Sequence, residues 1–276
     1  MRFQITLEPT RQGVLPLNYQ YELSSWIYKT LNHGNSEFAK WLHREGYIND
    51  YKRFKLFTFS NLKVPEFSID GDRMHIESDV VKLIVSFYPI DSLEYFISGL
   101  FHHQEFSIGD KKSKASFKVR TVEKLSEPEF CAVMEFRSLS PVLISHKKSP
   151  EQKHADYKHP TSNHYGKLLM NNLAMKYQAF YGRGPEVIED AQLDNKEEPV
   201  NGHPEYGFEV LSKAKSRLIT IKSGTGQESK LRGYLYRFRL KAPSELIRLG
   251  YYAGFGEKNS LGFGCAETDK NNYITS

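Results

Sequence analysis

RFQITLEPTRQGVLPLNYQYELSSWIYKTLN, residues 2–32, contains a change in the spacing of apolar side chains. In residues 2–8, Phe3, Ile5 and Leu7 alternate with polar side chains, which is the pattern of a half-buried strand. In residues 20–32 the apolar positions, such as Trp26 and Ile27, recur at spacings of three and four, which predicts an amphipathic helix. A strand followed by a helix indicates the start of a mixed α and β unit.

The next segments extend this start to about residue 122. The sequence predicts a short helix over 38–45, a strand over 54–60, and a hairpin formed by 74–76 and 80–88. Pro89 suits the first turn of a further helix, and 113–122 alternates as another strand. The order β, α, several β, α, β is that of a split βαβ sandwich of the ferredoxin type.

A second series of the same kind begins near residue 126. Residues 130–136 alternate as a strand, and 165–176 have helical spacing. Strands follow near 215–222 and 233–241, then a helix from Pro243 to about residue 252 and a last strand over 261–267. We therefore expect an α+β protein with two tandem ferredoxin-like (RRM-like) domains, 1–125 and 126–276, each an antiparallel sheet with helices on one face.

Composition limits the classes of protein that the chain can represent. Its 276 residues have no apolar stretch near the ~18 to 20 residues that cross a bilayer, and no signal or transit peptide is visible. Cys131 and Cys265 are too few for a disulfide framework, which fits a reducing compartment. We expect a cytoplasmic protein that does not contact membranes.

The net charge of +5 is unevenly placed along the chain. Residues 213–241 hold nine basic residues against one acid, and residues 111–124 hold six against one. Both clusters lie on predicted strands, which hold cations in fixed positions, as phosphate binding requires. The sequence thus favours a nucleic-acid partner, with these candidates for phosphate contacts: Lys118, Arg120, Arg217, Lys222, Arg237 and Arg239.

A glycine-rich segment, GFGEKNSLGFG, occupies residues 254–264. It follows a predicted helix and enters a strand, whereas a dinucleotide fingerprint or a P-loop follows a strand and opens a helix. Glycine permits close backbone approach, so the segment can present amides and Lys258 to a sugar-phosphate chain. The alternative is a tight connection between helix and strand. The candidate glycines are Gly254, Gly256, Gly262 and Gly264.

This glycine-rich segment, the N-terminal strand RFQITLEP, and the block FAKWLHREGY followed by KLFTFS closely resemble the Cas six family. Its members are CRISPR repeat-cleaving endoribonucleases of the RAMP superfamily. The resemblance implies tandem ferredoxin-like domains and metal-independent cutting of precursor CRISPR RNA within each repeat. It also implies 2′,3′-cyclic phosphate and 5′-hydroxyl ends on the mature guide RNA. The expected partners are repeat RNA and other CRISPR effector-complex proteins, for a monomer or a homodimer.

The resemblance also implies a catalytic triad. The family's tyrosine on the first helix, histidine ending the second and lysine opening the next strand match Tyr28, His43 and Lys55. Helical geometry independently places Tyr28 and His43 on the flanks of their predicted helices, where a site needs them. Lys52 and His33 are nearby competitors.

The reaction assigns a task to each candidate. A ribose 2′-OH must lose a proton and attack phosphorus, and the departing 5′-oxygen must gain one. Histidine exchanges protons near neutral pH, so His43 is the expected general base or acid. Lys55 would stabilise the charge of the transition state, and Tyr28 would hydrogen-bond the 2′-OH or the departing oxygen. The sequence leaves the division of labour between His43 and Tyr28 open, and we expect no metal and no cofactor.

Two other functions are compatible with the sequence. One is a non-catalytic RAMP-type protein that holds CRISPR RNA in an effector complex, which would bind RNA without cutting it. The other is a general RRM-like RNA binder, which needs exposed aromatic side chains on central strands. Phe57 and Phe59 can supply such side chains or can equally well be core residues.

Overall fold

The computed structural model describes residues 1–10, 13–146, 156–185 and 206–269. Five strands form the first sheet, in the order β5-β8-β1-β10-β9 with antiparallel neighbours. They are β1 (Arg2–Pro9), β5 (Phe57–Phe59), β8 (Val81–Phe87), β9 (Glu105–Gly109) and β10 (Lys114–Lys124). Helices α1 (Gln20–Gly34) and α3 (Ile90–His102) pack on one face of this sheet, and α2 (Ser36–Arg44) packs on α1.

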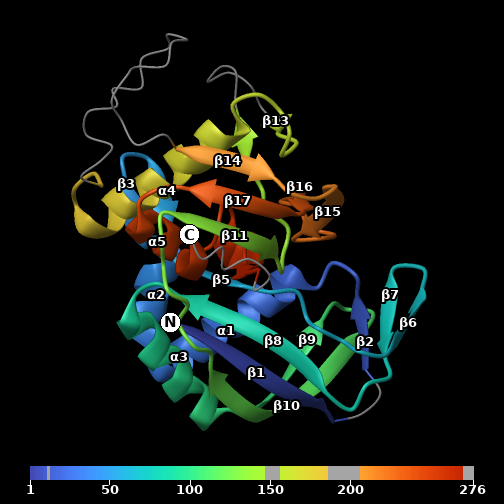
Figure 1. Cartoon of the computed structure of the whole chain (residues 1–276). Helices are drawn as coiled ribbons and strands as arrows, with labels where there is room; N and C mark the ends of the chain where they lie inside the picture. Colours follow the sequence, from blue (N-terminus) through green and yellow to red (C-terminus); the bar gives the residue numbers. More distant parts are fainter. Residues whose placement is uncertain (11–12, 147–155, 186–205, 270–276) are drawn as a thin grey trace, which may run out of the picture.

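The second sheet has the antiparallel order β14-β17-β11-β18. Its strands are β11 (Val133–Ser138), β14 (Gly207–Val210), β17 (Arg237–Lys241) and β18 (Ala266–Thr268). Helices α4 (Tyr165–Tyr181) and α5 (Ser244–Ala253) share one hydrophobic core with Phe136 and Phe238 of this sheet. In the first sheet, β1 lies between β10 and β8, the strand that precedes α3. In the second sheet, β11 lies between β18 and β17, the strand that precedes α5. This is the ferredoxin-like order, and it occurs twice in tandem (Figure 1).

Smaller sheets of two or three strands accompany the two main sheets. β2 (Gly13–Pro16), β7 (Arg73–Ile76) and β6 (Phe67–Asp70) form a three-stranded sheet. The remaining two-stranded pairs are β3 (Tyr47–Asn49) with β4 (Lys52–Phe54), β12 (Ser145–His146) with β13 (Asp156–Tyr157), and β15 (Lys215–Ile221) with β16 (Ser229–Leu235). A single 3-10 turn, η1 (Asn259–Leu261), lies within the glycine-rich segment of the described chain. None of the helices in the described ranges is both long enough and apolar enough to span a bilayer.

The predicted hairpin of 74–76 with 80–88 is wrong. β7 pairs with β6 and β2, whereas β8 pairs with β1 and β5. The chain reverses earlier than predicted, at the two-residue turn between Asp70 and Arg73, where Gly71 has a φ of +57°. Glycine adopts this left-handed conformation without steric cost, so the tight turn forms there.

Two predicted strands are interrupted. The expected strand 54–60 divides into β4 and β5, because Leu56 has a φ of +51° and is buried in the core of the second sheet. The expected strand 233–241 divides at Tyr236 into β16 and β17, which belong to different sheets. The last strand is limited to β18, because η1 and the glycine-rich segment occupy most of the range 261–267. Alternating polarity does not reveal such local changes of backbone direction.

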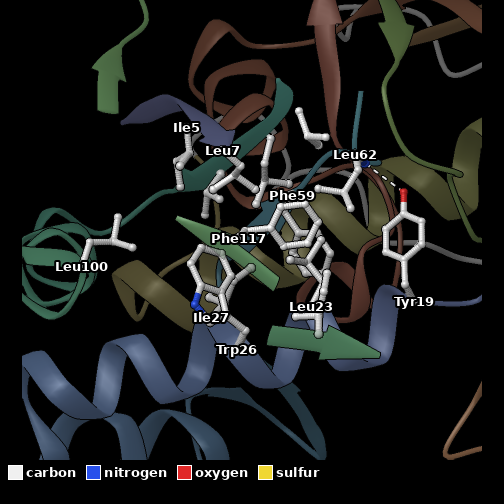
Figure 2. Close-up of a cluster of buried hydrophobic side chains, with 14 of the residues drawn as sticks. Ile5, Leu7, Tyr19, Leu23, Trp26, Ile27, Phe59, Leu62, Leu100 and Phe117 are labelled. Carbon is white, nitrogen blue, oxygen red and sulfur yellow. Dashed lines mark hydrogen bonds between the residues drawn. The ribbon is translucent and has the colours of Figure 1, made fainter. Parts of the chain in front are cut away.

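The core of the first sheet lies between its strands and α1. Figure 2 shows Ile5 and Leu7 of β1, Trp26 and Ile27 of α1, and Phe117 of β10 within one buried cluster. At its edge, the backbone N–H of Leu62 donates to the Tyr19 hydroxyl over 2.8 Å.

Arg2 joins the two sheets. Its side chain is buried, and its guanidinium lies 3.6 Å from the ring centroid of Tyr251 on α5. The same group donates to the Ala266 carbonyl over 2.6 Å and to the Tyr251 carbonyl. A buried cation needs such partners, so this contact fixes the first strand against the second sheet's elements.

Candidate active site

Tyr28 on α1 and His43 on α2 converge although they belong to different helices. Their ring centroids are 5.2 Å apart, and the rings are nearly perpendicular at 85°. The helices are joined only by Asn35, whose side chain accepts a hydrogen bond of 2.9 Å from the Phe38 amide and so caps α2. This tight turn positions the two side chains predicted to be catalytic on adjacent helix surfaces.

Tyr28 and His43 line one hollow of about 360 Å³ between α1 and α2. Its other described lining residues are Lys29, Asn32, His33, Ala39, Lys40 and Arg44. This lining contains three cations and two histidines, with no carboxylate among the described residues, so it favours an anion such as phosphate. Lys29, Lys40 and Arg44 were not among the site residues predicted from the sequence. Lys29 follows Tyr28 directly, Lys40 lies three residues before His43, and Arg44 follows His43. These positions were the available signal in the sequence.

The hydroxyl of Tyr28 remains protonated at neutral pH. Burial raises the pKa of Tyr28 to about 12, and a hydrogen bond with the Ser260 side chain opposes this rise. Ser260 is also tied to α1, because the Ser24 hydroxyl donates to its carbonyl over 2.6 Å. The glycine-rich segment therefore contacts α1 beside Tyr28, and Tyr28 is equipped to donate a hydrogen bond.

Lys55 contacts the backbone of His43 at the C-terminal end of α2. Its ammonium donates to the carbonyl of His43 over 2.9 Å and to the carbonyl of Leu42. Burial, with a further contribution from Arg53, lowers the pKa of Lys55 to about 8, while Glu45 opposes the shift. The ammonium thus caps the last turn of the helix that carries His43, and the hollow's described lining does not include it.

The two competing residues differ in placement. His33 lines the same hollow as His43, with its ring centroid 3.9 Å from that of His103. The Lys52 ammonium lies 3.5 Å from Met175 Sδ on α4. The structure therefore brings Lys55 into contact with the His43 backbone, and it directs Lys52 toward α4.

The glycine-rich segment lies largely inside the protein. Gly254, Gly256, Gly262 and Gly264 are buried, with φ values of +94°, +73°, +86° and +77°. The Gly264 amide donates to the Pro141 carbonyl over 2.9 Å, and Lys258 is exposed. Of these five predicted RNA contacts, only Lys258 presents an exposed side chain, so a role for the glycines in binding remains a prediction.

Lys176 on α4 holds this segment in place. Its side chain is buried, and its ammonium donates to the carbonyls of Gly254 and Gly256 over 2.6 Å and 2.7 Å. Burial lowers the pKa of Lys176 to about 7, and Glu257 opposes this shift. The structural role of Lys176 was not predicted from the sequence. The available signal was a lysine on the apolar side of a predicted helix.

The predicted cations of β10 and of the β15–β16 hairpin are exposed to different degrees. Lys118 and Arg120 are exposed on β10, but Lys118 lies in register with Glu8 and Glu105 on the adjacent strands. Arg217 is exposed on β15. Lys222 is half-buried at the end of the hairpin, where its ammonium donates to the Gln227 side chain.

Arg237 and Arg239 lie in a network of ion pairs on β17. Arg239 contacts Glu135 and Glu209, each over 2.6 Å. Arg237 contacts Asp269 over 2.5 Å. Because these carboxylates already neutralise the two guanidinium groups, a phosphate must compete with them, and RNA binding by this pair remains a prediction.

Within the described ranges, no group of three or more His, Cys, Asp and Glu side chains is arranged to hold a metal ion. His154, in the histidine-containing stretch 146–164, and the acidic stretch 186–198 lie outside the described residues.

Known proteins resemble this chain over nearly its whole length. The CRISPR-associated endoribonuclease Cas6 1 of Methanocaldococcus jannaschii is 29% identical over 265 residues, covering 96% of this chain and 91% of the relative. A solved structure of a Cas6-related protein from Pyrococcus furiosus has a TM-score of 0.80 and 26% identity, with 99% of each chain covered. The structure of an RAMP protein that binds different RNA substrates has a TM-score of 0.78 and 27% identity, covering 98% of this chain and 100% of that one.

Two family descriptions match the chain in succession. "CRISPR-associated protein Cas6, N-terminal" matches residues 14–123. "CRISPR associated protein Cas6, C-terminal" matches residues 125–268, which is more than half of the 276 residues. The tandem ferredoxin-like order agrees with both matches, and the chain belongs to the Cas6 family of CRISPR-associated proteins.

Proposed function

We propose that the protein is an endoribonuclease that cuts precursor CRISPR RNA within its repeats and so produces mature guide RNA. The observation that carries the proposal is the Tyr28–His43 pair, whose ring centroids lie 5.2 Å apart in a hollow lined with cations. The name of the M. jannaschii relative, a CRISPR-associated endoribonuclease, supports the same activity.

The proposed reaction is metal-independent transesterification. The 2′-OH of the nucleotide before the scissile phosphate loses its proton to His43, and its oxygen attacks phosphorus. The bond from phosphorus to the 5′-oxygen breaks, and that oxygen takes a proton from the His43 imidazolium, directly or through solvent. The products are a 2′,3′-cyclic phosphate and a 5′-hydroxyl. Histidine can perform both proton transfers near neutral pH.

The raised pKa of Tyr28 supports one division of labour. With a pKa of about 12, the hydroxyl of Tyr28 does not act as a base at neutral pH. We therefore assign proton removal to His43, and to Tyr28 a hydrogen bond donated to an oxygen of the reacting phosphate. Such a donor stabilises the negative charge that develops in the transition state.

Lys55 has two tasks in this proposal. Its bonds to the carbonyls of Leu42 and His43 hold the end of α2 and thereby the His43 backbone. The ammonium lies outside the described lining of the hollow, so its charge would act on the substrate through space and not by direct contact. The Lys29, Lys40 and Arg44 side chains lie on the hollow itself and would hold the phosphates directly.

The rest of the RNA would follow exposed cations. Lys118, Arg120, Arg217 and Lys258 are exposed and the best placed, with the half-buried Lys222, Arg237, Arg239 and the glycines as further proposed contacts. We also retain a division into domains 1–125 and 126–276, a cytoplasmic location, and a monomer or homodimer that works with other CRISPR effector-complex proteins.

A single-turnover assay on the host's own repeat RNA tests this function. One substrate is unmodified, and the other carries a single 2′-deoxy sugar before the scissile phosphate, both in excess EDTA. Cutting of the first alone, with a cyclic phosphate end, supports the proposal. Tight binding of both without cutting would identify a non-catalytic RNA-binding protein, and cutting of both would contradict attack by the 2′-OH.

A further inference from the structure

A second hollow lies beside the candidate active site. It has a volume of about 470 Å³ and is formed by α1 and by β9 with the end of β10. Lys29 and His33 of α1 line both hollows. The two spaces therefore adjoin along one helix, and a chain that enters the first can continue into the second.

The walls of the second hollow combine aromatic rings with cations. The half-buried Phe106 stacks on the buried Trp26 with ring centroids 4.0 Å apart, and the half-buried Tyr21 lines the same space, so Phe106 and Tyr21 offer the aromatic surface. Lys29 and Lys114 contribute exposed cations, beside one exposed carboxylate, Glu105, which lies in register with Lys118. Single-stranded RNA is commonly held by this combination, because bases contact aromatic side chains and phosphates contact lysines. The volume also lies within the range of roughly 300 to 1,000 Å³ that is typical of small-molecule sites.

Glu22 adds an acceptor to this hollow. Its Oε2 atom is buried and has no hydrogen-bond partner among the described residues. Burial raises the pKa of this carboxyl, and its own backbone N–H opposes the shift through a hydrogen bond. A buried carboxylate oxygen is costly without a donor, and the exocyclic amino group of a nucleobase is such a donor.

We propose that the hollow between α1 and β9 holds one nucleotide of the repeat RNA close to the scissile phosphate, with Lys29 on the connecting phosphate. Glu22 accepts a hydrogen bond from the amino group of that base. Uracil offers only its N3–H, which lies between two carbonyl oxygens that repel a carboxylate, so adenine, cytosine or guanine binds better than uracil. This inference rests on the proposed function, since the neighbouring hollow must receive the scissile phosphate.

Filling the hollow tests the proposal. Ser25 lies on α1 in the hollow's wall, so Ser25→Trp places a large ring there. Ser98→Trp is the matched control, because Ser98 is exposed on α3 and lies outside both hollows. Binding is measured with repeat RNA made non-cleavable by a 2′-deoxy sugar, and with copies in which each of three nucleotides on either side of the scissile phosphate is abasic in turn. Circular dichroism verifies that both variants are folded.

For the wild type and Ser98→Trp, one abasic position is expected to weaken binding about tenfold, as loss of base stacking does. Ser25→Trp should bind intact RNA about tenfold more weakly and be insensitive to that same abasic position. Equal affinities and equal abasic profiles for the two tryptophan variants would overturn the proposal. Because the RNA is not cut in this assay, the result is independent of whether the wild type cleaves.

The role of Glu22 is tested at the position so identified. The wild type should bind RNA with uracil there about tenfold more weakly than RNA with an amino-bearing base. Glu22→Gln, which both donates and accepts, should reduce this preference to less than threefold. A wild type that binds uracil as tightly as the other bases would refute the assignment of Glu22. If the wild type does not cleave intact RNA yet shows this preference, the proposed function fails and the nucleotide site stands.

Discussion

The ring of Tyr28 on α1 meets the imidazole of His43 on α2 edge to face, with centroids 5.2 Å apart. Only Asn35 separates the two helices, so the pair depends on one tight turn. The turn η1, in the second half of the chain, supports the Tyr28–His43 pair, because its residue Ser260 contacts both Ser24 and Tyr28. The proposed site is thus built on the first ferredoxin-like unit and supported by the second.

Tyr28→Phe should slow single-turnover cleavage by about tenfold or more, because the donated hydrogen bond is lost. The pKa of Tyr28 is raised to about 12, so its hydroxyl stays protonated from pH 6 to pH 9. The rates of the wild type and the variant should therefore run parallel over this range. A difference that grows with pH would indicate that Tyr28 ionises and acts as a base.

Cleavage should decline as the pH rises through about 8, because the pKa of Lys55 is lowered to about 8 and its ammonium loses charge above that value. Lys55→Arg keeps its charge throughout this range. Its pH–rate profile should therefore lack the alkaline decline, even if its rate at pH 7 is lower. An identical decline in both proteins would assign the titration to another group.

Gly264→Ala should lower the free energy of unfolding by about 3 kcal/mol, through left-handed strain and a steric clash. Gly264 has a φ of +77°, and a Cβ atom there would lie 2.0 Å from the Phe255 carbonyl oxygen. Gly182→Ala is the control, because Gly182 has a φ of +70° with nothing within 4 Å of a Cβ. It should cost only about 1 kcal/mol of strain. Thermal melting measures the stability of both variants. Equal losses of stability would mean that the contact between the new Cβ atom and the Phe255 carbonyl is relieved at little cost.

Arg217→Ala should weaken RNA binding and reduce the slope of its salt dependence by about one unit. Arg239→Ala should change the slope less, because Glu135 and Glu209 already bind the Arg239 guanidinium over 2.6 Å. Arg217 is exposed on β15. Binding titrations at several salt concentrations compare the two variants. A larger slope change for Arg239→Ala would place the RNA path over β17.

Local pattern was sufficient to predict much of the fold. The alternation of Phe3, Ile5 and Leu7 predicted β1, and the spacing around Trp26 predicted α1, so Tyr28 and His43 were placed on helix flanks. The resemblance then supplied the roles expected of them. Both sheets have the ferredoxin-like order that the succession of elements predicted.

What the sequence could not supply depends on contacts between distant residues. The division of the 54–60 segment follows from the positive φ of Leu56, which is buried in the core of the second sheet. The ion pairs of Arg239 require the register of β17 with β11 and β14, and no local pattern encodes that register. The buried position of the glycine-rich segment likewise depends on Lys176, far away in sequence.

The proposed role of His43 in proton transfer is tested most directly by comparing two histidine variants. The single-turnover rate and the RNA affinity of His43→Ala are measured beside those of His75→Ala, a histidine on β7. We expect a rate lower by about 10² or more for His43→Ala with nearly unchanged affinity, and a wild-type rate for His75→Ala. A wild-type rate for His43→Ala would show that His43 does not transfer the proton.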